Sequence, residues 1–309
     1  MAREMNCLYG DIIVTRDGVI AQSLGIPLGE YCSVIPKYVV CEGMTPWRAR
    51  WARLCRIIRG YGPRGLEKAV RTAEIPEKYH PSFGRSVPAL HPWDAVLIVE
   101  AVEALASAIA RGEPGTLGAL SALGLRSGLD GSLGLTGSRA GGYPHERSDV
   151  DLVAYGPEAA TRLYEEFSAL GGPWDPASKS DLGGVLVNRP LDLSWRRRVI
   201  DTPLGRYPVT WTGAPAEPLA HCPPLRHSNG LGKPVGIVRE RICVEPGQET
   251  ALLYPPCVQT GGGWIVSFEY NLAGLLYSGG CIIVEALKTS DGVILLGARE
   301  YPGRIWTGD

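Results

Sequence analysis

The stretch TGSRAGGYPHERSDVDLVAYG, residues 136–156, carries the side chains of this chain that are best suited to chemistry. Asp149 and Asp151 alternate there with apolar residues, which predicts a strand that presents both carboxylates on one face. Two neighbouring carboxylates repel each other unless a cation lies between them. Oxygen ligands on a rigid strand suit Mg²⁺, whose remaining ligands are waters and substrate phosphates. We therefore expect Asp149 and Asp151 to bind Mg²⁺, or Mn²⁺ in its place.

The residues just upstream of this pair predict a phosphate site. Gly137 allows the backbone to approach a phosphate closely, and Ser138 offers a hydroxyl and an N–H at the same point. Arg139 and Arg147 add positive charge that can bind phosphate oxygens. We expect these four residues to hold the phosphates of a nucleotide.

The motifs GSRAGG and SDVDL together resemble the nucleotidyltransferase superfamily. This superfamily includes DNA polymerase beta, the CCA-adding and poly(A) polymerases and the minimal nucleotidyltransferases. Thr136 stands where a hydrophobic residue is more usual, and Gly141 stands where the minimal group often has a second arginine. The whole chain also resembles uncharacterised archaeal predicted nucleotidyltransferases. The resemblance implies transfer of a nucleoside monophosphate from an NTP such as ATP to a hydroxyl, with release of pyrophosphate.

The resemblance also implies a third acidic residue on a later strand. In RPLDLSWRRR, Asp192 is flanked by leucines in strand alternation. The resemblance therefore places Asp192 with Asp149 and Asp151 in a metal site of the two-metal kind. Asp192 would orient or deprotonate the acceptor hydroxyl there. Asp201 is a competitor, although IDTPLG is typical of a turn.

Arginine-rich segments favour RNA as the acceptor. Helical spacing over residues 46–59 predicts an amphipathic helix, and its arginine face can lie along a nucleic-acid backbone or simply be solvated. Beyond Asp192, Trp195 and the three arginines after it can bind a triphosphate or stack on an RNA end, or can merely alternate along a strand. The expected partners are an NTP and RNA, the latter through Arg48, Arg53, Arg56, Arg196, Arg197 and Arg198.

Two other functions remain open from the sequence. The acceptor can be a protein hydroxyl or a small molecule, or the chain can be a non-catalytic RNA- or protein-binding module that keeps the fold. A positive stripe from the arginine-rich segment to the aspartates would favour RNA. His145 can touch substrate from its loop, whereas His221, Cys222 and His227 lack a fourth ligand for zinc.

The fold class that these patterns predict is α+β, in three parts. Residues 1–90 form an N-terminal β-rich module, and residues 91–215 form the nucleotidyltransferase domain, a mixed sheet with helices. Residues 235–309 form a small β-barrel-like domain, which can be OB-like. A hairpin is expected at Asp17-Gly18, and helices are expected over residues 92–110 and from Pro157 to the glycine at 171.

Net charge, hydropathy and cysteine usage exclude some classes of protein and indicate a cellular compartment. The net charge of −1 excludes a globally basic nucleic-acid coat. Glutamates interrupt the longest apolar stretch, residues 95–110, which excludes a membrane-spanning helix there. The chain has eight cysteines without a Cys-x-x-Cys motif, and its start does not resemble a signal peptide. We therefore expect buried thiols in a cytoplasmic protein, with disulfides as the alternative for a hyperthermophile, which an excess of arginine over lysine weakly indicates.

Overall fold

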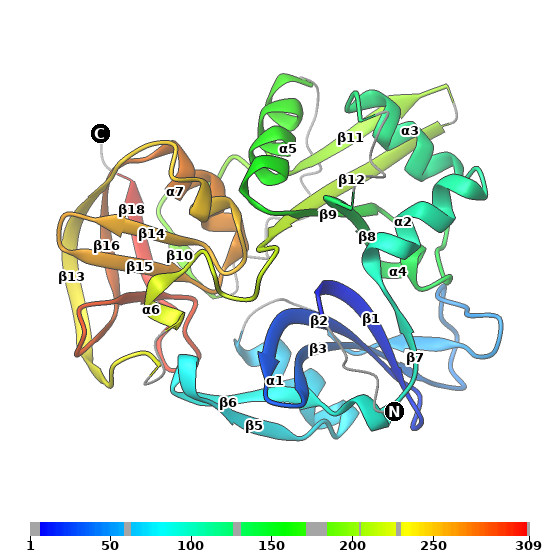
Figure 1. Ribbon diagram of the computed structural model, residues 1–309, viewed down its shortest axis with the longest axis horizontal. Coiled ribbons are helices and arrows are strands. Elements are labelled where there is room, and N and C mark those ends of the chain that lie inside the picture. The colour runs from blue at the N-terminus through cyan, green and yellow to red at the C-terminus, as the bar shows by residue number, and fades with distance from the viewer. Residues whose placement is uncertain are drawn as a thin grey trace.

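Three β-sheets organise the part of the chain that the computed structural model describes (Figure 1). The described residues are 7–58, 63–125, 131–170, 184–203, 205–226 and 230–307. Helices and strands are mixed in the α+β manner that the sequence predicts. Residues from all three sheets line one central cavity, so the fold is best described by what each sheet contributes to it.

The N-terminal sheet begins with the predicted hairpin at Asp17-Gly18. β1 and β2 pair antiparallel, and Gly18 makes the turn with φ +78°, a conformation that favours glycine. The strand order is β5-β6-β3-β2-β1-β7, with β4 beside β3. The elements are β1 (Tyr9–Thr15), β2 (Val19–Leu28), β3 (Tyr31–Val40), β4 (Leu54–Arg56), α1 (Pro63–Ala73), β5 (Glu77–His80), a 3₁₀ turn (Pro81–Phe83), β6 (Arg85–Leu90) and β7 (Ala95–Val99).

The arginine-rich helix predicted over residues 46–59 does not form in its described part. The chain runs there as a loop that leads into β4, and a disulfide joins Cys41 to Cys55 across it. Pairing of β4 with β3 holds Cys55 in an extended conformation. Trp47 still packs on Tyr38, with 5.5 Å between the ring centroids. Of the apolar residues at helical spacing, Leu54 and Ile58 are buried, Trp47 is half-buried and Trp51 is exposed. A cross-link and strand pairing thus override local helix propensity.

The helix predicted over residues 92–110 is divided into a 3₁₀ turn (Pro92–Asp94), the edge strand β7 and the helix α2 (Ala101–Ala110). The apolar run of β7 pairs antiparallel with β1, so these residues extend the N-terminal sheet instead of lengthening the helix. Among the described residues, no helix is both long and apolar enough to cross a membrane.

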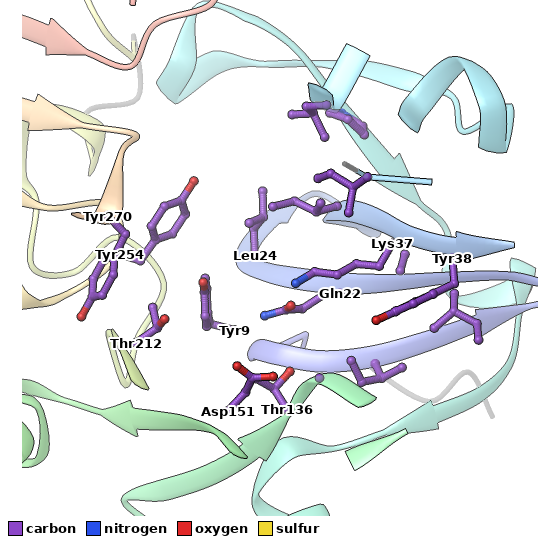
Figure 2. Close-up of a pocket in the computed structure, with 18 of the residues that line it drawn as sticks. Tyr9, Gln22, Leu24, Lys37, Tyr38, Thr136, Asp151, Thr212, Tyr254 and Tyr270 are labelled. Atoms are coloured by element: carbon purple, nitrogen blue, oxygen red, sulfur yellow. The ribbon is translucent and has the colours of Figure 1, made fainter. Parts of the chain in front are cut away.

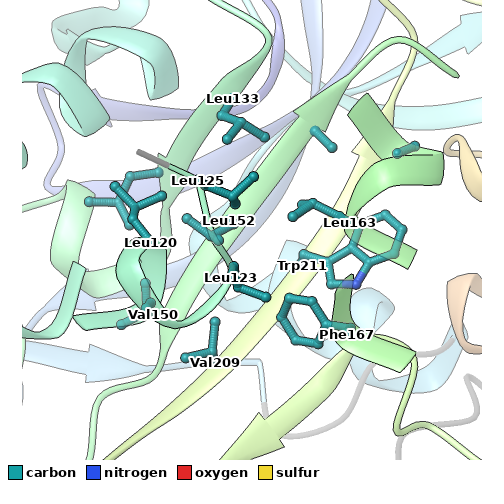
Figure 3. Packing of buried hydrophobic residues seen from close by; sticks show 14 of the residues in the cluster. Leu120, Leu123, Leu125, Leu133, Val150, Leu152, Leu163, Phe167, Val209 and Trp211 are labelled. Atoms are coloured by element: carbon teal, nitrogen blue, oxygen red, sulfur yellow. The ribbon is translucent and has the colours of Figure 1, made fainter. Parts of the chain in front are cut away.

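The central sheet has the order β11-β12-β9-β8, and β9 and β12 run parallel. Its helices pack on one face, where Trp211 and Phe167 are the largest fully buried side chains (Figure 3). Val150 and Leu152 point into this core, so Asp151 between them faces the other way. The predicted helix from Pro157 is confirmed. The elements are α3 (Pro114–Ala122), β8 (Leu133–Thr136), α4 (Gly137–Ala140), β9 (Val150–Tyr155), α5 (Pro157–Ala169), β11 (Arg197–Thr202) and β12 (Gly205–Ala214).

The C-terminal strands form a closed barrel, as the sequence predicts. The order β13-β14-β15-β17-β16 closes on itself through pairing of β16 with β13, and a second cluster of buried residues fills the interior. The short strands β18 and β10 add to its edge. The elements are β10 (Leu186–Val187), α6 (Pro223–Arg226), β13 (Pro234–Val244), β14 (Cys257–Thr260), β15 (Gly263–Ser267), α7 (Ala273–Ser278), β16 (Gly280–Thr289), β17 (Ile294–Leu296) and β18 (Arg304–Thr307), with 3₁₀ turns at Glu249–Leu252 and Tyr270–Leu272.

A tyrosine hydroxyl joins the barrel to the central sheet. The Tyr270 hydroxyl accepts a hydrogen bond from the Gly213 N–H at 2.6 Å and donates to the Leu252 carbonyl at 2.7 Å. A Cβ added at Gly213 would lie 2.0 Å from that same carbonyl oxygen. Glycine at the end of β12 therefore lets the two parts of the molecule approach at backbone distance.

The expectation of buried thiols is wrong, and the alternative of disulfides is the one the structure has. All eight cysteines are paired, as Cys7–Cys32, Cys41–Cys55, Cys222–Cys257 and Cys243–Cys281. Such pairs are typical of oxidising compartments and of proteins from inside hyperthermophiles. A cytoplasmic location therefore stays a prediction.

Asp11 is a buried carboxylate that ties the N-terminal sheet to α2. It is 1% exposed and accepts hydrogen bonds from the Ala101 and Leu8 N–H groups, both at 2.9 Å. Burial raises the pKa of Asp11 from 3.8 to about 6, against the opposing effect of these two hydrogen bonds. A carboxyl whose folded pKa lies above its unfolded value stabilises the fold most when it is protonated.

We expect the free energy of unfolding contributed by Asp11 to be largest below pH 4 and to fall as the pH rises to about 6. The loss should be on the order of 2 kcal/mol, because one pKa unit corresponds to about 1.4 kcal/mol. Urea unfolding of the wild type and of Asp11→Asn at several pH values measures it. A difference between the two proteins that does not change over this range would contradict the prediction.

Candidate active site

A cavity of about 670 Å³ lies where the three sheets meet. Figure 2 shows Asp151 and Thr136 of the central sheet at this cavity, together with Lys37 and Gln22 of the N-terminal sheet, whose side chains point into it. Tyr254 and Tyr270 close the side nearest the barrel. The volume is within the usual range for small-molecule sites.

Strand register places a row of polar side chains across the cavity face of the central sheet. Thr136 pairs with Asp151, Asp151 with Thr210, and Thr210 with Arg197. The Thr210 hydroxyl donates a hydrogen bond to Asp151 Oδ1 at 2.6 Å. Asp151 is thus held in one orientation by its neighbour on the parallel strand.

Gly137 lies directly against the Asp151 carboxylate. Its φ is +70°, and a Cβ built on it would lie 2.2 Å from Asp151 Oδ2. Any side chain there would strain the backbone and displace the carboxylate. The sequence predicts that Gly137 lets the backbone approach a phosphate. In the structure, Gly137 lies close to the carboxylate of Asp151.

Asp149 immediately precedes β9 and lies on the same cavity. Burial and the charge of Asp151 raise the pKa of Asp149 to about 6, and the positive charges of Arg197 and Arg56 act in the opposite direction. Arg197 Nη2 lies 4.0 Å from Asp149 Oδ2. The pKa of Asp149 is raised because the nearby positive charges do not fully offset burial and the repulsion from Asp151. A divalent cation between the two carboxylates would remove this repulsion. The donor set and the glycine beside it therefore fit one such ion.

Asp192 does not join this pair. It lies exposed outside the described strands, where Oδ1 accepts a hydrogen bond from the Ser194 N–H at 2.8 Å, and it does not line the cavity. Of the two leucines that suggested a strand, Leu193 is buried and Leu191 is half-buried, and the Arg197 N–H donates to the Leu193 carbonyl in a turn. The competitor Asp201 is exposed on β11 beside Arg206.

The strand that does lie beside β9 carries no acidic residue. β12 presents Thr210 at the position next to Asp151 and Thr212 two residues further on. Within the described residues, no three His, Cys, Asp or Glu side chains are grouped closely enough to hold a metal. The three-carboxylate site that the resemblance implies is thus reduced to two carboxylates.

Ser138 lines the cavity, whereas Arg139 does not and supports the backbone beside it. The Ser138 hydroxyl donates to Ser148 Oγ at 3.0 Å. Arg139 donates to the Asp149 carbonyl at 3.0 Å and to the Ser148 carbonyl at 2.8 Å, and it forms an ion pair with Glu113 at 2.5 Å. Arg139 therefore fixes the backbone of Asp149, which corrects its expected role in phosphate binding.

Glu113 is a residue that sequence reasoning missed. Its carboxylate accepts hydrogen bonds from the Thr116 and Gly115 N–H groups at the start of α3 and pairs with Arg139. A capping glutamate gives no sequence signal for an ion pair with a residue that lies in another element.

The expected RNA-binding arginines separate into three groups. Arg56, Arg196 and Arg197 line the cavity, together with Arg147. Arg48 and Arg53 are exposed in the loop that the Cys41–Cys55 disulfide closes, and an antiparallel β-bridge joins their backbones. Arg198 is buried on the opposite face of β11, where Nε donates to the Phe167 carbonyl at 3.3 Å. Positive charge therefore reaches the aspartates, but not from one continuous helix.

The histidines have separate roles. His145 lines the cavity, and its ring packs edge-on against Trp47 with 5.3 Å between the ring centroids. His221 Nε2 lies 2.8 Å from the Pro255 carbonyl, and Cys222 is in a disulfide, so neither is placed as a zinc ligand. His227 lies outside the described residues.

Compared with known protein families, with curated proteins and with solved structures, the chain matches none of them.

Proposed function

We propose that this chain transfers a nucleoside monophosphate from an NTP to a hydroxyl acceptor. The observation that carries the proposal is the pair Asp149 and Asp151 on a shared cavity, with Gly137 packed against one carboxylate. The parallel strand β12 beside them and the resemblance of the motifs support the same reaction. The departure from that resemblance is Thr210 in place of a third acid.

Asp149 and Asp151 would hold Mg²⁺ or Mn²⁺, which when bound neutralises the charge of the triphosphate. Arg56, Arg147 and Arg197 line the same cavity and would bind phosphate oxygens with charge-assisted hydrogen bonds. These side chains would orient the α-phosphorus toward the acceptor, which is most of what phosphoryl transfer requires of a protein.

The reaction balances without an additional reactant. The acceptor oxygen forms a bond to the α-phosphorus, and the bond from that phosphorus to the bridging oxygen breaks. Pyrophosphate leaves with the electron pair, and the hydroxyl proton passes to solvent. Within the described residues, no third carboxylate is grouped with Asp149 and Asp151 as part of a metal site.

RNA is the first candidate acceptor, and a small molecule is the second. The exposed arginines Arg48 and Arg53 lie on the loop that leads to Arg56 in the cavity, which favours an anionic polymer. The limited volume of the cavity between three sheets favours a small molecule.

Substitution of both Asp149 and Asp151 by asparagine should reduce nucleotidyl transfer by on the order of a thousandfold, because the cation and its charge are lost. The measurement is incorporation of label from each NTP, with Mg²⁺ or Mn²⁺, into an extract of source cells with and without ribonuclease. Asp192→Asn is the matched control and should keep wild-type activity, since Asp192 lies away from the cavity.

Label in ribonuclease-sensitive material identifies RNA as the acceptor, and label in protein or in small molecules identifies the other branches. If the wild type shows no transfer and no metal-dependent NTP binding, the chain is a binding module and the proposed reaction is wrong.

A further inference from the structure

Arg196 is a cation of the cavity wall that has only neutral partners among the described residues. Its Nη1 donates to Asn271 Oδ1 at 2.8 Å and its Nη2 to Thr212 Oγ1 at 3.3 Å. The guanidinium lies over the Tyr270 ring, 4.7 Å from the centroid. Its Nε is buried and has no hydrogen-bond partner, and no carboxylate in the described part of the chain lies within ion-pair distance of it.

A guanidinium that is withdrawn from water and has only neutral partners destabilises the protein unless an anion binds to it. Removing a charge from water costs several kcal/mol, and hydrogen bonds to neutral oxygens offset only part of this. Burial lowers the pKa of Arg196, which reports the same imbalance. Glu269, whose charge acts on Arg196 from beyond ion-pair distance, accepts a hydrogen bond from the Asn271 N–H at 3.0 Å. Within the described residues, Arg196 is therefore left without a carboxylate in direct contact at this point of the cavity.

The position of Arg196 relative to the aspartates indicates which substrate, the NTP or the acceptor, would supply an anion to it. The Gly137 turn follows β8, at one edge of the central sheet, and Asp151 lies on the next strand. Arg196 lies on the other side of Asp151, because it binds Thr212 of β12. Thr212 is two residues beyond Thr210, about 7 Å further along the strand. Arg197, by contrast, is paired with Thr210 itself, so an NTP held by Arg197 and the Gly137 turn leaves Arg196, further along the strand, for the acceptor.

Aromatic rings line this side of the cavity. Tyr9 and Tyr254 have ring centroids 5.3 Å apart, and Tyr254 lies 6.5 Å from Tyr270. Such rings pack well against a sugar or a base.

We propose that Arg196 binds an anionic group of the acceptor, a phosphate or a carboxylate, and so directs the acceptor hydroxyl to Asp151. This inference rests on the proposed nucleotidyl transfer. The same chemistry is offered by a small sugar phosphate, by a hydroxy acid and by the terminal phosphodiester of an RNA. Arg196 is thus a specificity-determining residue that selects acceptors with a negative charge close to the reacting hydroxyl.

Calorimetric titration of the full chain with three probes tests the proposal: ribose 5-phosphate, glycerate and a short oligoribonucleotide with a free 3′-hydroxyl. Arg196→Gln removes the charge. Asn271→Asp keeps Arg196 but gives it a permanent carboxylate partner at the 2.8 Å contact, so this variant remains informative if Arg196→Gln fails to fold. Asn188→Asp adds the same charge to an exposed residue that does not line the cavity.

We expect one of the probes to bind the wild type and Asn188→Asp equally, and to bind Asn271→Asp and Arg196→Gln about tenfold more weakly or worse. The probe that does so names the source of the anion. Unchanged affinity in both cavity variants, or no binding of any probe to the wild type, overturns the proposal. Mn²⁺-dependent NTP binding, measured in the same proteins, should change little in the cavity variants. Its absence from the wild type would instead identify a failure of the proposed function.

Discussion

Replacing Gly137 with alanine is expected to abolish binding of Mn²⁺ by the aspartate pair and, with it, nucleotidyl transfer. The added Cβ would lie 2.2 Å from Asp151 Oδ2, far inside van der Waals contact, so the carboxylate must move. Movement would also break its 2.6 Å hydrogen bond with Thr210. A displaced ligand can cost a hundredfold in affinity or rate, roughly the effect of a misplacement of about 1 Å at a reacting centre.

Gly142→Ala is the control for backbone strain in this experiment. Gly142 has φ +77°, nearly the same as Gly137, but a Cβ there meets nothing within 4 Å. Both variants should lose about 1 kcal/mol of stability from the left-handed conformation. Only Gly137→Ala should lose Mn²⁺ binding, measured by electron paramagnetic resonance. Equal Mn²⁺ affinity in the two variants would show that the contact between Gly137 and Asp151 has no role in the site.

Reduction of the four disulfides is expected to lower the unfolding temperature by on the order of 20 °C. The bonds close loops with sequence separations of 14, 25, 35 and 38 residues. Closing loops of these lengths restricts the unfolded chain and so stabilises the fold by about 3–4 kcal/mol for each disulfide. The sum is comparable to the whole free energy of unfolding of a typical domain. Thermal unfolding with and without a reductant, followed by circular dichroism, measures the effect.

Two paired variants separate the contributions to this loss. Replacing both Cys222 and Cys257 with alanine removes a fully buried bond from the cluster beside the barrel, and should destabilise more than the same change at Cys41 and Cys55 in their partly exposed loop. Free thiols in the native protein, detected by mass spectrometry after alkylation, would contradict the prediction, as would an unfolding temperature that a reductant leaves unchanged.

The features that could be predicted from the sequence are those that depend on near neighbours. Alternation around Asp149 and Asp151 indicated the strand β9, which begins just after Asp149. Asp17-Gly18 indicated the N-terminal hairpin, and Pro157 indicated the start of α5. In each case the determining residues lie within one turn or one strand, where backbone preference and hydrophobic spacing act directly.

The features that were missed depend on partners distant in sequence. The arginine-rich segment has helical spacing, but the disulfide between Cys41 and Cys55 and the pairing of β4 with β3 keep it extended. The partner of Asp151 is Thr210, which is 59 residues away on a strand whose register no local pattern specifies. Asp192 had the right chemistry and alternation, yet nothing in its own segment could show that it lies in a solvent-exposed turn.

The hydroxyl of Tyr270, which bridges the Gly213 N–H and the Leu252 carbonyl, has a consequence for how this chain can change in evolution. Gly213 lies on β12 three residues beyond Thr210, the partner of Asp151, so this contact of the barrel is made close to the site. A different module exchanged for the barrel would need to present a hydroxyl at the same point and leave room at the same glycine. Selection for the chemistry of the central sheet therefore also constrains the barrel, and the two must be inherited as one unit.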